Sequence, residues 1–360
     1  MPAIKVLVVD DSALMRKVIK RILTEAGDFE VHTARDGLDA LDQTQRIQPD
    51  VITLDVNMPG MDGLTCLAEI MKRQPRPVVM VSSLTEAGAL VTLEALQMGA
   101  VDFVPKPGGT VSLNMDAVAD DLVTKVRSAA RTRVGRAGGL TARLRAQRSQ
   151  PEPPRPVLRR APTGAAPRRH PVDAVLIGSS TGGPVLLSTI LSQLPASLTA
   201  PVLVAQHIPA SFTAALANRL DGICQLEVHE VGRPMTVRPG HVYLGRGDAD
   251  MVVTRRDDGL VAKPVPAGEN YRWHPSVDRL VASAARFVDP ARLVCVLLTG
   301  MGADGAKEMA AVHAAGGRTI AEAEETAVVW GMPGELVGRG GATRVLPNDQ
   351  IARLITDWVG

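Results

Sequence analysis

The stretch Val175–Gly183, VLIGSSTGG, places a serine between glycines at the point where an apolar run gives way to a helical pattern. Gly178, Ser180 and Gly182 form a G-x-S-x-G pattern, which is typical of a turn that presents a serine hydroxyl between a strand and a helix. Backbone N–H groups at the start of that helix would favour negative charge, including a tetrahedral oxyanion. Ser180 is therefore a candidate nucleophile. A glycine-rich phosphate loop is the alternative, although the G-x-G-x-x-G spacing is absent.

A serine nucleophile needs a base within hydrogen-bond reach and a carboxylate that orients the base. His207 directly follows the apolar run APVLVAQ, and Asp304 follows LVCVLLT and a glycine-rich segment. Both are therefore expected near the ends of strands. His274, next to Trp273, is the second choice for the base. The chain order serine, histidine, acid differs from the serine, acid, histidine order of α/β-hydrolases, so the same chemistry is expected on a different fold.

A second set of polar residues lies in the first third of the chain, each after a short apolar run. The set is Asp10, Asp11, Asp55, Ser82 and Lys106. Carboxyl ends of parallel strands meet at one edge of a sheet, so these side chains are expected to lie together. Three carboxylates would attract Mg²⁺, which offsets phosphoryl charge and makes phosphoryl transfer to Asp55 feasible. Each residue taken alone could instead cap a helix, open a turn or face solvent.

The elements that must position these residues are short apolar runs that alternate with helical patterns, between residues 4 and 104 and again from residue 173 onward. This alternation predicts the α/β class with two doubly wound domains, a flavodoxin-like N-terminal domain and a Rossmann-like C-terminal domain. Residues 241–265 contain HVYLG and the hairpin pattern MVVTRRDDGLVAKPV. They predict an antiparallel β insert in the second domain.

Residues 125–171 differ in composition from the domains predicted on either side, 1–124 and 172–360. This segment holds 13 Lys and Arg and one acidic residue, Glu152, so its net charge is +12 while the rest of the chain carries −10. Repeated Pro and Arg predict a disordered basic linker. No aromatic residue is interleaved with the arginines for base stacking, so nucleic acid is not an expected partner.

Amino-acid composition limits the class of protein and the cellular compartment that we expect. With 45% hydrophobic residues and a formal net charge of +2, the chain resembles an ordinary globular protein. The sequence lacks an apolar run of about 18 residues and a secretory signal pattern. Cys66, Cys224 and Cys295 are far apart and show no metal-ligand spacing. We therefore expect a cytoplasmic protein that is not embedded in a membrane and has free thiols.

The motifs VVDDSALMR, TLDVNMPGMDG, MVSSLT and DFVPKP resemble the receiver domain of response regulators. The resemblance implies that Asp55 accepts a phosphoryl group. It implies that Mg²⁺ is held by the carboxylates of Asp10, Asp11 and Asp55 and by the main-chain carbonyl of Asn57. It further implies that Ser82 binds a phosphoryl oxygen, that Lys106 pairs with the phosphate, and that Phe103 is the aromatic switch residue.

The motifs IGSSTGGP, QHIPASFT, SVDRLVASAA and LLTGMGADGA are similar to the catalytic domain of the chemotaxis protein-glutamate methylesterase family, CheB. The resemblance implies that Ser180 is the nucleophile, His207 the base and Asp304 the orienting acid. The implied oxyanion candidates are Thr181, Gly182 and Met301. The implied activity is phosphorylation-activated hydrolysis of glutamate γ-methyl esters on methyl-accepting chemoreceptors, which releases methanol. A chemotaxis histidine kinase would be the phosphodonor, the esterase would need no cofactor, and many members also deamidate receptor glutamines.

Two further hypotheses follow from this organisation. The receiver is expected to pack over the Ser180 rim, with phosphorylation of Asp55 shifting the domains so that substrate can enter. The alternative function is a response regulator that binds DNA or serves as a scaffold without esterase activity. No helix-turn-helix pattern follows the receiver motifs, and methanol release would distinguish the two functions.

Overall fold

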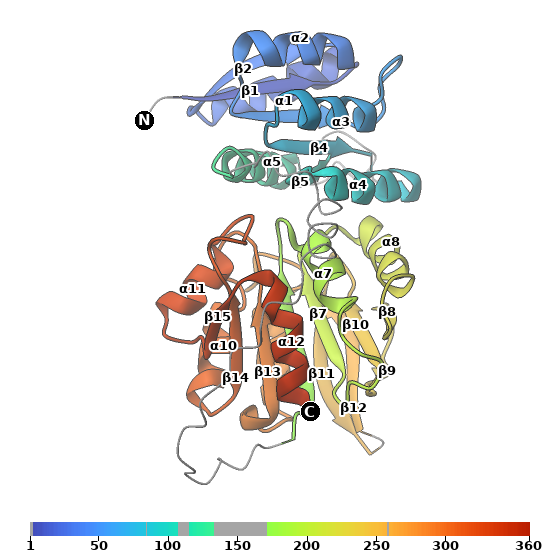
Figure 1. Ribbon diagram of the computed structural model, residues 1–360, viewed down its shortest axis with the longest axis vertical. Helices are drawn as coiled ribbons and strands as arrows, with labels where there is room; N and C mark the ends of the chain where they lie inside the picture. The colour runs from blue at the N-terminus through green and yellow to red at the C-terminus, as the bar shows by residue number, and fades with distance from the viewer. Residues whose placement is uncertain (1–2, 84, 107–114, 133–170, 258) are drawn as a thin grey trace, which may run out of the picture.

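Two α/β domains are stacked along the long axis of the molecule in the computed structural model (Figure 1). The structure describes residues 3–360 apart from residues 84, 107–114, 133–170 and 258. Most of the predicted basic linker therefore lies outside the described residues. The predicted fold class is confirmed, because each domain is built on a parallel sheet with helices on both faces.

The N-terminal domain has five parallel strands in the order β2-β1-β3-β4-β5. Its elements are β1 (Ile4–Val9), α1 (Ala13–Glu25), β2 (Phe29–Ala34), α2 (Gly37–Ile47), β3 (Val51–Asp55), α3 (Gly63–Arg73), β4 (Val78–Ser82), α4 (Glu86–Met98), β5 (Asp102–Pro105) and α5 (Met115–Ala129). Side chains of Ser12, Asp36, Asp62 and Thr85 cap α1 to α4 by accepting a backbone N–H. The boundary expected at residues 124 and 125 falls inside α5.

The C-terminal domain has a seven-stranded parallel sheet in the order β15-β14-β13-β6-β7-β10-β8. Its strands are β6 (Ala174–Ser179), β7 (Val202–Gln206), β8 (Glu227–Val231), β9 (Met235–Thr236), β10 (His241–Gly245), β11 (Ala249–Arg256), β12 (Gly259–Pro266), β13 (Leu293–Leu297), β14 (Arg318–Glu322) and β15 (Arg344–Leu346). Its helices are α7 (Gly183–Leu191), α8 (Ala210–Asp221), α9 (Val277–Ala285), the 3₁₀ turn η2 (Pro290–Arg292), α10 (Ala306–Ala314), α11 (Met332–Gly338) and α12 (Asn348–Val359).

The predicted antiparallel insert is present as β11 and β12, with β9 added at its edge. The assignment of HVYLG to this insert is wrong, because β10 is a parallel strand of the main sheet between β7 and β8. Its residues Val242, Tyr243 and Leu244 are buried, as a strand covered on both faces requires.

Strand β6 occupies the centre of the large sheet, between β7 and β13. From β6 the chain first adds β7, β8 and β10 on one side and later adds β13, β14 and β15 on the other. Such a switch point is where open α/β sheets bind ligands. Two glycines let neighbouring elements approach it closely. A Cβ on Gly178 would lie 2.4 Å from Val277 Cγ1, and one on Gly183 would lie 2.0 Å from Gln206 Oε1.

The N-terminal domain, the predicted receiver, contacts the carboxyl edge of the large sheet through α4, β5 and α5 (Figure 1). The ring centroids of Phe103 in β5 and Phe212 in α8 are 4.3 Å apart, and both rings are buried. One apolar cluster continues from the receiver core into the core beneath α7, α8 and α12. The two domains therefore share apolar surface at the edge that carries the predicted nucleophile.

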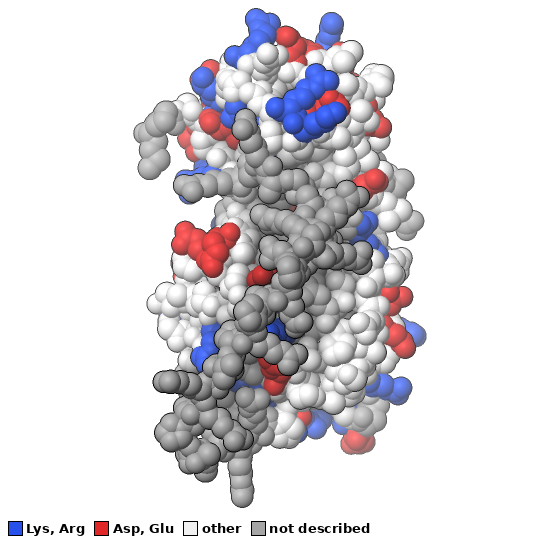
Figure 2. All heavy atoms as spheres, viewed as in Figure 1, with Lys and Arg blue, Asp and Glu red and all other residues white. Residues whose placement is uncertain are grey.

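Acidic and basic side chains are interspersed over both domains on the face shown in Figure 2. The three cysteines are free thiols, as expected, and Cys66 and Cys295 are buried. Within the described residues, every helix is too short or too polar to cross a membrane.

Candidate active site

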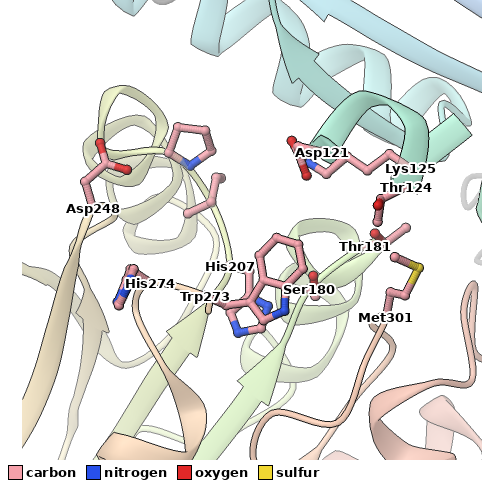
Figure 3. Close-up of a pocket in the computed structure, with 12 residues that line it drawn as sticks. Asp121, Thr124, Lys125, Ser180, Thr181, His207, Asp248, Trp273, His274 and Met301 are labelled. Atoms are coloured by element: carbon pink, nitrogen blue, oxygen red, sulfur yellow. The ribbon is translucent and has the colours of Figure 1, made fainter. Parts of the chain in front are cut away.

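A pocket of about 200 Å³ lies between the two domains, beside the loops that follow β6, β7 and β13 (Figure 3). Ser180 and His207 line it from the catalytic domain, together with Trp273 and Met301. From the receiver, α5 contributes three lining residues: Asp121, Thr124 and Lys125. The predicted nucleophile and base therefore face one pocket that the receiver covers on one side.

The carboxylate of Asp304 holds the His207 ring. His207 Nε2 is 2.8 Å from Asp304 Oδ2. The same carboxylate accepts backbone N–H groups of Val277 at 2.7 Å and Asp278 at 2.9 Å, and the Ser276 hydroxyl at 3.0 Å. These donors belong to the first turn of α9 and its cap, where the helix dipole favours an anion. Burial by itself would raise the pKa of Asp304, but these bonds lower it, so the group remains a carboxylate.

The second ring nitrogen of His207 faces away from this carboxylate. His207 Nδ1 is buried and has no hydrogen-bond partner among the described residues. Trp273 stacks on the ring, with centroids 5.7 Å apart and planes 17° from parallel (Figure 3). The backbone N–H of His207 also donates to the carbonyl of Ser179 at 3.0 Å. Asp304 and Trp273 thus fix a ring that has one unpaired nitrogen and lines the same pocket as Ser180.

The three oxyanion candidates lie around Ser180 in two loops. Gly182 is in the left-handed conformation, with φ 79°, and precedes α7. Met301 follows Gly300, whose added Cβ would lie 2.7 Å from Ser180 Cβ, so this loop passes directly beside the serine. The backbone of Thr181 lies between Ser180 and α7, but its side chain is directed to the receiver.

Asp102, a carboxylate of the receiver, contacts the Thr181 side chain. The Thr181 hydroxyl donates to Asp102 Oδ2, and Asp102 is buried at the domain interface. Lys125 Nζ lies 3.7 Å from Asp102 Oδ1 and donates to the carbonyl of Phe103 at 2.8 Å. Burial raises the pKa of Asp102, while Lys125 and Thr181 oppose that shift. Sequence analysis missed Asp102, although an acid inside the apolar run VDFV was a detectable signal.

The acidic residues of the receiver meet at the carboxyl edge of its sheet. Oxygen atoms from Asp10, Asp11 and Asp55 all lie within 4.8 Å of one another. Lys106 Nζ is 2.7 Å from Asp55 Oδ2 and 3.2 Å from Asp10 Oδ2. Asn57 is adjacent, because its backbone N–H is 3.3 Å from Asp55 Oδ1. Burial raises the pKa of Asp55, and the Lys106 hydrogen bond opposes it.

These donors fit a hard cation. Carboxylate oxygens are the ligands that Mg²⁺ prefers, and Asp10 Oδ2 is buried without a well-aligned hydrogen bond in the described part of the chain. Ser82 ends the neighbouring strand β4, and its buried hydroxyl is 3.4 Å from the carbonyl of Gly88. Phe103, the expected switch residue, lies in the domain interface, where its ring packs against Phe212.

Comparison with known proteins decides the family. Residues 175–355 match the family model described as CheB methylesterase, and residues 6–117 match the response regulator receiver domain. The chain belongs to the CheB methylesterase family.

Relatives of this CheB-family chain extend over nearly its whole length. A protein of Rhodopseudomonas palustris named protein-glutamate methylesterase/protein-glutamine glutaminase 2 is 54% identical and covers 99% of this chain and 98% of its own length. A protein of Rhodospirillum rubrum with the same name, numbered 3, is 52% identical over 99% of this chain and 96% of its own length. The crystal structure of the Thermotoga maritima CheB methylesterase catalytic domain is 37% identical with a TM-score of 0.50, and covers 52% of this chain and 98% of that one. The predicted family is confirmed.

Sequence analysis also missed Glu322, which supports the loop beside Ser180 in this CheB-family chain. Glu322 ends β14 and is fully buried. It accepts the backbone N–H of Thr299 at 2.7 Å and the hydroxyl of Thr326 at 3.0 Å. The Thr299 hydroxyl in turn is 2.9 Å from the carbonyl of Thr181. Burial raises the pKa of Glu322 to about 7.

His274, the second choice for the base, lines the same pocket but is held by another carboxylate. Its Nδ1 is 2.9 Å from Asp250 Oδ1, and Arg279 Nη1 is 2.6 Å from Asp250 Oδ2. Burial opposes ionisation of Asp250, but the His274, Ser276 and Arg279 contacts lower its pKa overall. His274 is therefore fixed at the rim by a carboxylate different from the one that holds His207.

Replacing Glu322 with Gln should stabilise the catalytic domain at pH 8 and have little effect near pH 4.5. A buried carboxyl whose pKa rises from 4.5 to about 7 on folding loses stability as pH rises through that window, and Gln does not ionise. The gain at pH 8 should be on the order of 3 kcal/mol. Denaturant unfolding followed by tryptophan fluorescence measures it, because Trp273, Trp330 and Trp358 all lie in this domain. The exposed Glu324→Gln is the control, and equal pH dependence in Glu322→Gln and the wild type would contradict the account.

Proposed function

We propose that this chain hydrolyses glutamate γ-methyl esters on methyl-accepting chemoreceptors and releases methanol, with Ser180, His207 and Asp304 as its catalytic triad. The observation that carries the proposal is the Asp304-held His207 ring, which has an unpaired Nδ1 and lines the same pocket as Ser180. The relatives named protein-glutamate methylesterase/protein-glutamine glutaminase, which match 99% of this chain, support the same activity.

The first half of the reaction forms an acyl-enzyme. Ser180 Oγ attacks the ester carbonyl carbon while His207 Nδ1 takes the hydroxyl proton. Asp304 keeps the proton of the neutral ring on Nε2 and stabilises the imidazolium that forms. The oxyanion is stabilised by N–H groups near Thr181, Gly182 and Met301. His207 then returns its proton to the leaving oxygen, and methanol departs.

The second half regenerates the enzyme. Water attacks the acyl carbon while His207 removes a water proton. His207 then gives this proton to Ser180 Oγ as the Ser180–acyl bond breaks, which releases the glutamate carboxylate. Nucleophile, base and orienting acid are all side chains, so the proposed esterase chemistry uses no cofactor. The same two steps on a glutamine side chain would release ammonia, and we include this deamidation in the proposed function because the names of the relatives contain it.

The receiver is proposed to control access to the pocket. Residues of α5 line the pocket, and Asp102 at the start of β5 contacts Thr181, next to the nucleophile. Lys106, just past the other end of β5, pairs with Asp55. A phosphoryl group on Asp55 would draw Lys106 toward new negative charge and displace the strand that holds Asp102. Release of the interface would open the pocket to the receptor chain.

Phosphorylation of Asp55 is proposed to use a Mg²⁺ ion held at four positions: Asp10, Asp11, Asp55 and the main-chain carbonyl of Asn57. The ion, when bound, offsets the negative charge of the phosphoryl group. We propose that Ser82, which ends β4, and Lys106, which follows β5, bind phosphoryl oxygens. A chemotaxis histidine kinase is the proposed donor, and the cytoplasm is the proposed compartment.

The alternative function, a DNA-binding or scaffolding response regulator, is not favoured. The domain that follows the receiver matches the CheB methylesterase model rather than a nucleic-acid-binding module. Its polar cluster at Asp304 holds the His207 ring, which lines the same pocket as Ser180.

Replacing Ser180 with Ala should reduce methanol release from methylated receptor membranes by a factor of about 10⁴ or more, because the acyl-enzyme cannot form. Ser192→Ala, which removes a hydroxyl from the end of α7, should retain wild-type activity and serves as the matched control. Far-UV circular dichroism establishes that both variants fold. Ordinary turnover by a folded Ser180→Ala protein would contradict the triad.

Replacing Asp102 with Ala should raise methanol release by the unphosphorylated full-length chain about tenfold, because loss of one buried charged hydrogen bond weakens the closed arrangement by about 1.4 kcal/mol. Phosphorylation should then activate this variant less than the wild type. Asp120→Ala, an exposed change on α5, is the control. Unchanged basal activity together with full activation by phosphorylation would exclude Asp102 from the inhibitory contact.

A further inference from the structure

Three side chains with metal-binding atoms meet at the edge of the catalytic sheet, outside both sites described above. Glu227 and His229 are alternate residues of β8, so they project from the same face of the strand. Parallel pairing places His241 of β10 opposite Glu227 and Tyr243 opposite His229. Strand register therefore brings one carboxylate and two imidazoles together, with the Tyr243 ring beside them.

The three residues lie far from the proposed catalytic chemistry. Glu227 opens β8 and His241 opens β10, so the cluster is at the amino edge of the parallel sheet. Ser180 and His207 follow the carboxyl ends of β6 and β7, at the opposite edge. Neither the esterase mechanism nor the receiver uses this cluster.

The distances between the donor atoms match one face of a metal coordination tetrahedron. His229 Nε2 is 3.0 Å from His241 Nδ1, and Glu227 Oε2 is 3.5 Å from His241 Nδ1 and 3.7 Å from His229 Nε2. Zinc bonds of about 2.0–2.2 Å in tetrahedral geometry place neighbouring ligand atoms about 3.3–3.6 Å apart. A point about 2.1 Å from each of the three atoms lies about 0.7 Å out of their plane, as in a tetrahedral zinc site with a fourth ligand.

The facing imidazole nitrogens of His229 and His241 also favour a bound cation. At 3.0 Å the facing ring nitrogens cannot both carry a proton, so at least one imidazole directs a lone pair at the other. A metal ion would satisfy both lone pairs and neutralise the carboxylate. The side chains of His229 and His241 are 35% and 24% exposed, so an ion can enter from solvent and keep a water ligand.

We propose that Glu227, His229 and His241 form a zinc site, with water as the fourth ligand. Two imidazoles and one carboxylate suit Zn²⁺ better than Mg²⁺ or Ca²⁺, which prefer oxygen ligands. Bound zinc would cross-link β8, the edge strand, to β10 and so stabilise that edge of the catalytic domain.

Zinc titration of the full-length chain tests this site. The protein is stripped with a chelator, supplied with millimolar Mg²⁺ to saturate the receiver carboxylates, and titrated with Zn²⁺ against a chromophoric indicator. One equivalent should bind with a Kd below about 10 µM. His229→Gln and His241→Gln should each weaken binding at least about 100-fold, since even outer-shell partners of a metal ligand contribute 10–100-fold.

His32→Gln is the matched control. His32 pairs with Glu30 at 2.8 Å on β2, and this pair lacks a third ligand among the described residues. Zinc should also raise the melting temperature of the wild type and of His32→Gln but not that of His241→Gln, while the metal-free variants should melt like the wild type. Wild-type binding weaker than about 10 µM, or a tight equivalent that survives in either the His229→Gln or the His241→Gln variant, would overturn the site.

Discussion

A buried carboxylate shared by the two domains is the contact on which the rest of the arrangement depends. Asp102 belongs to the receiver but gives one oxygen to the Thr181 hydroxyl, next to Ser180 in the catalytic domain. Burial disfavours its charge, and two groups compensate: Lys125 of the same domain and the Thr181 hydroxyl of the catalytic domain. The Thr181 hydrogen bond exists only while the domains stay together. The adjacent Phe103–Phe212 contact adds apolar burial at the same place. The receiver is thereby held over the pocket of the proposed nucleophile.

One short strand connects this contact to the predicted phosphorylation site. Asp102 opens β5, and Lys106 follows its last residue and pairs with Asp55. A charge added to Asp55 therefore acts on a strand whose other end touches Thr181. The proposed coupling needs no long chain of side chains, since both events act on the ends of β5.

Much of this organisation could be predicted from the sequence, because the carboxyl ends of parallel strands converge wherever strands and helices alternate. That rule alone placed Ser180, His207 and Asp304 together, and the motifs identified the family. The role of β10 could not be predicted, because a short apolar run does not reveal whether its neighbours are parallel or antiparallel. Asp102 and Glu322 were missed for a related reason: each acts through a partner distant in sequence, and burial becomes visible only when the segments are assembled.

The most direct test of whether the receiver covers Ser180 is the rate at which a small fluorophosphonate modifies this serine. Intact-protein mass spectrometry follows the modification. Full-length protein is compared before and after phosphorylation with a small acyl phosphate and Mg²⁺, with Ser180→Ala as the blank. If the receiver covers an activated serine, phosphorylation should accelerate labelling about tenfold, in line with release of one buried charged contact, and the blank should stay unlabelled. Equal rates in the two states, or labelling of Ser180→Ala, would contradict a receiver-gated serine hydrolase.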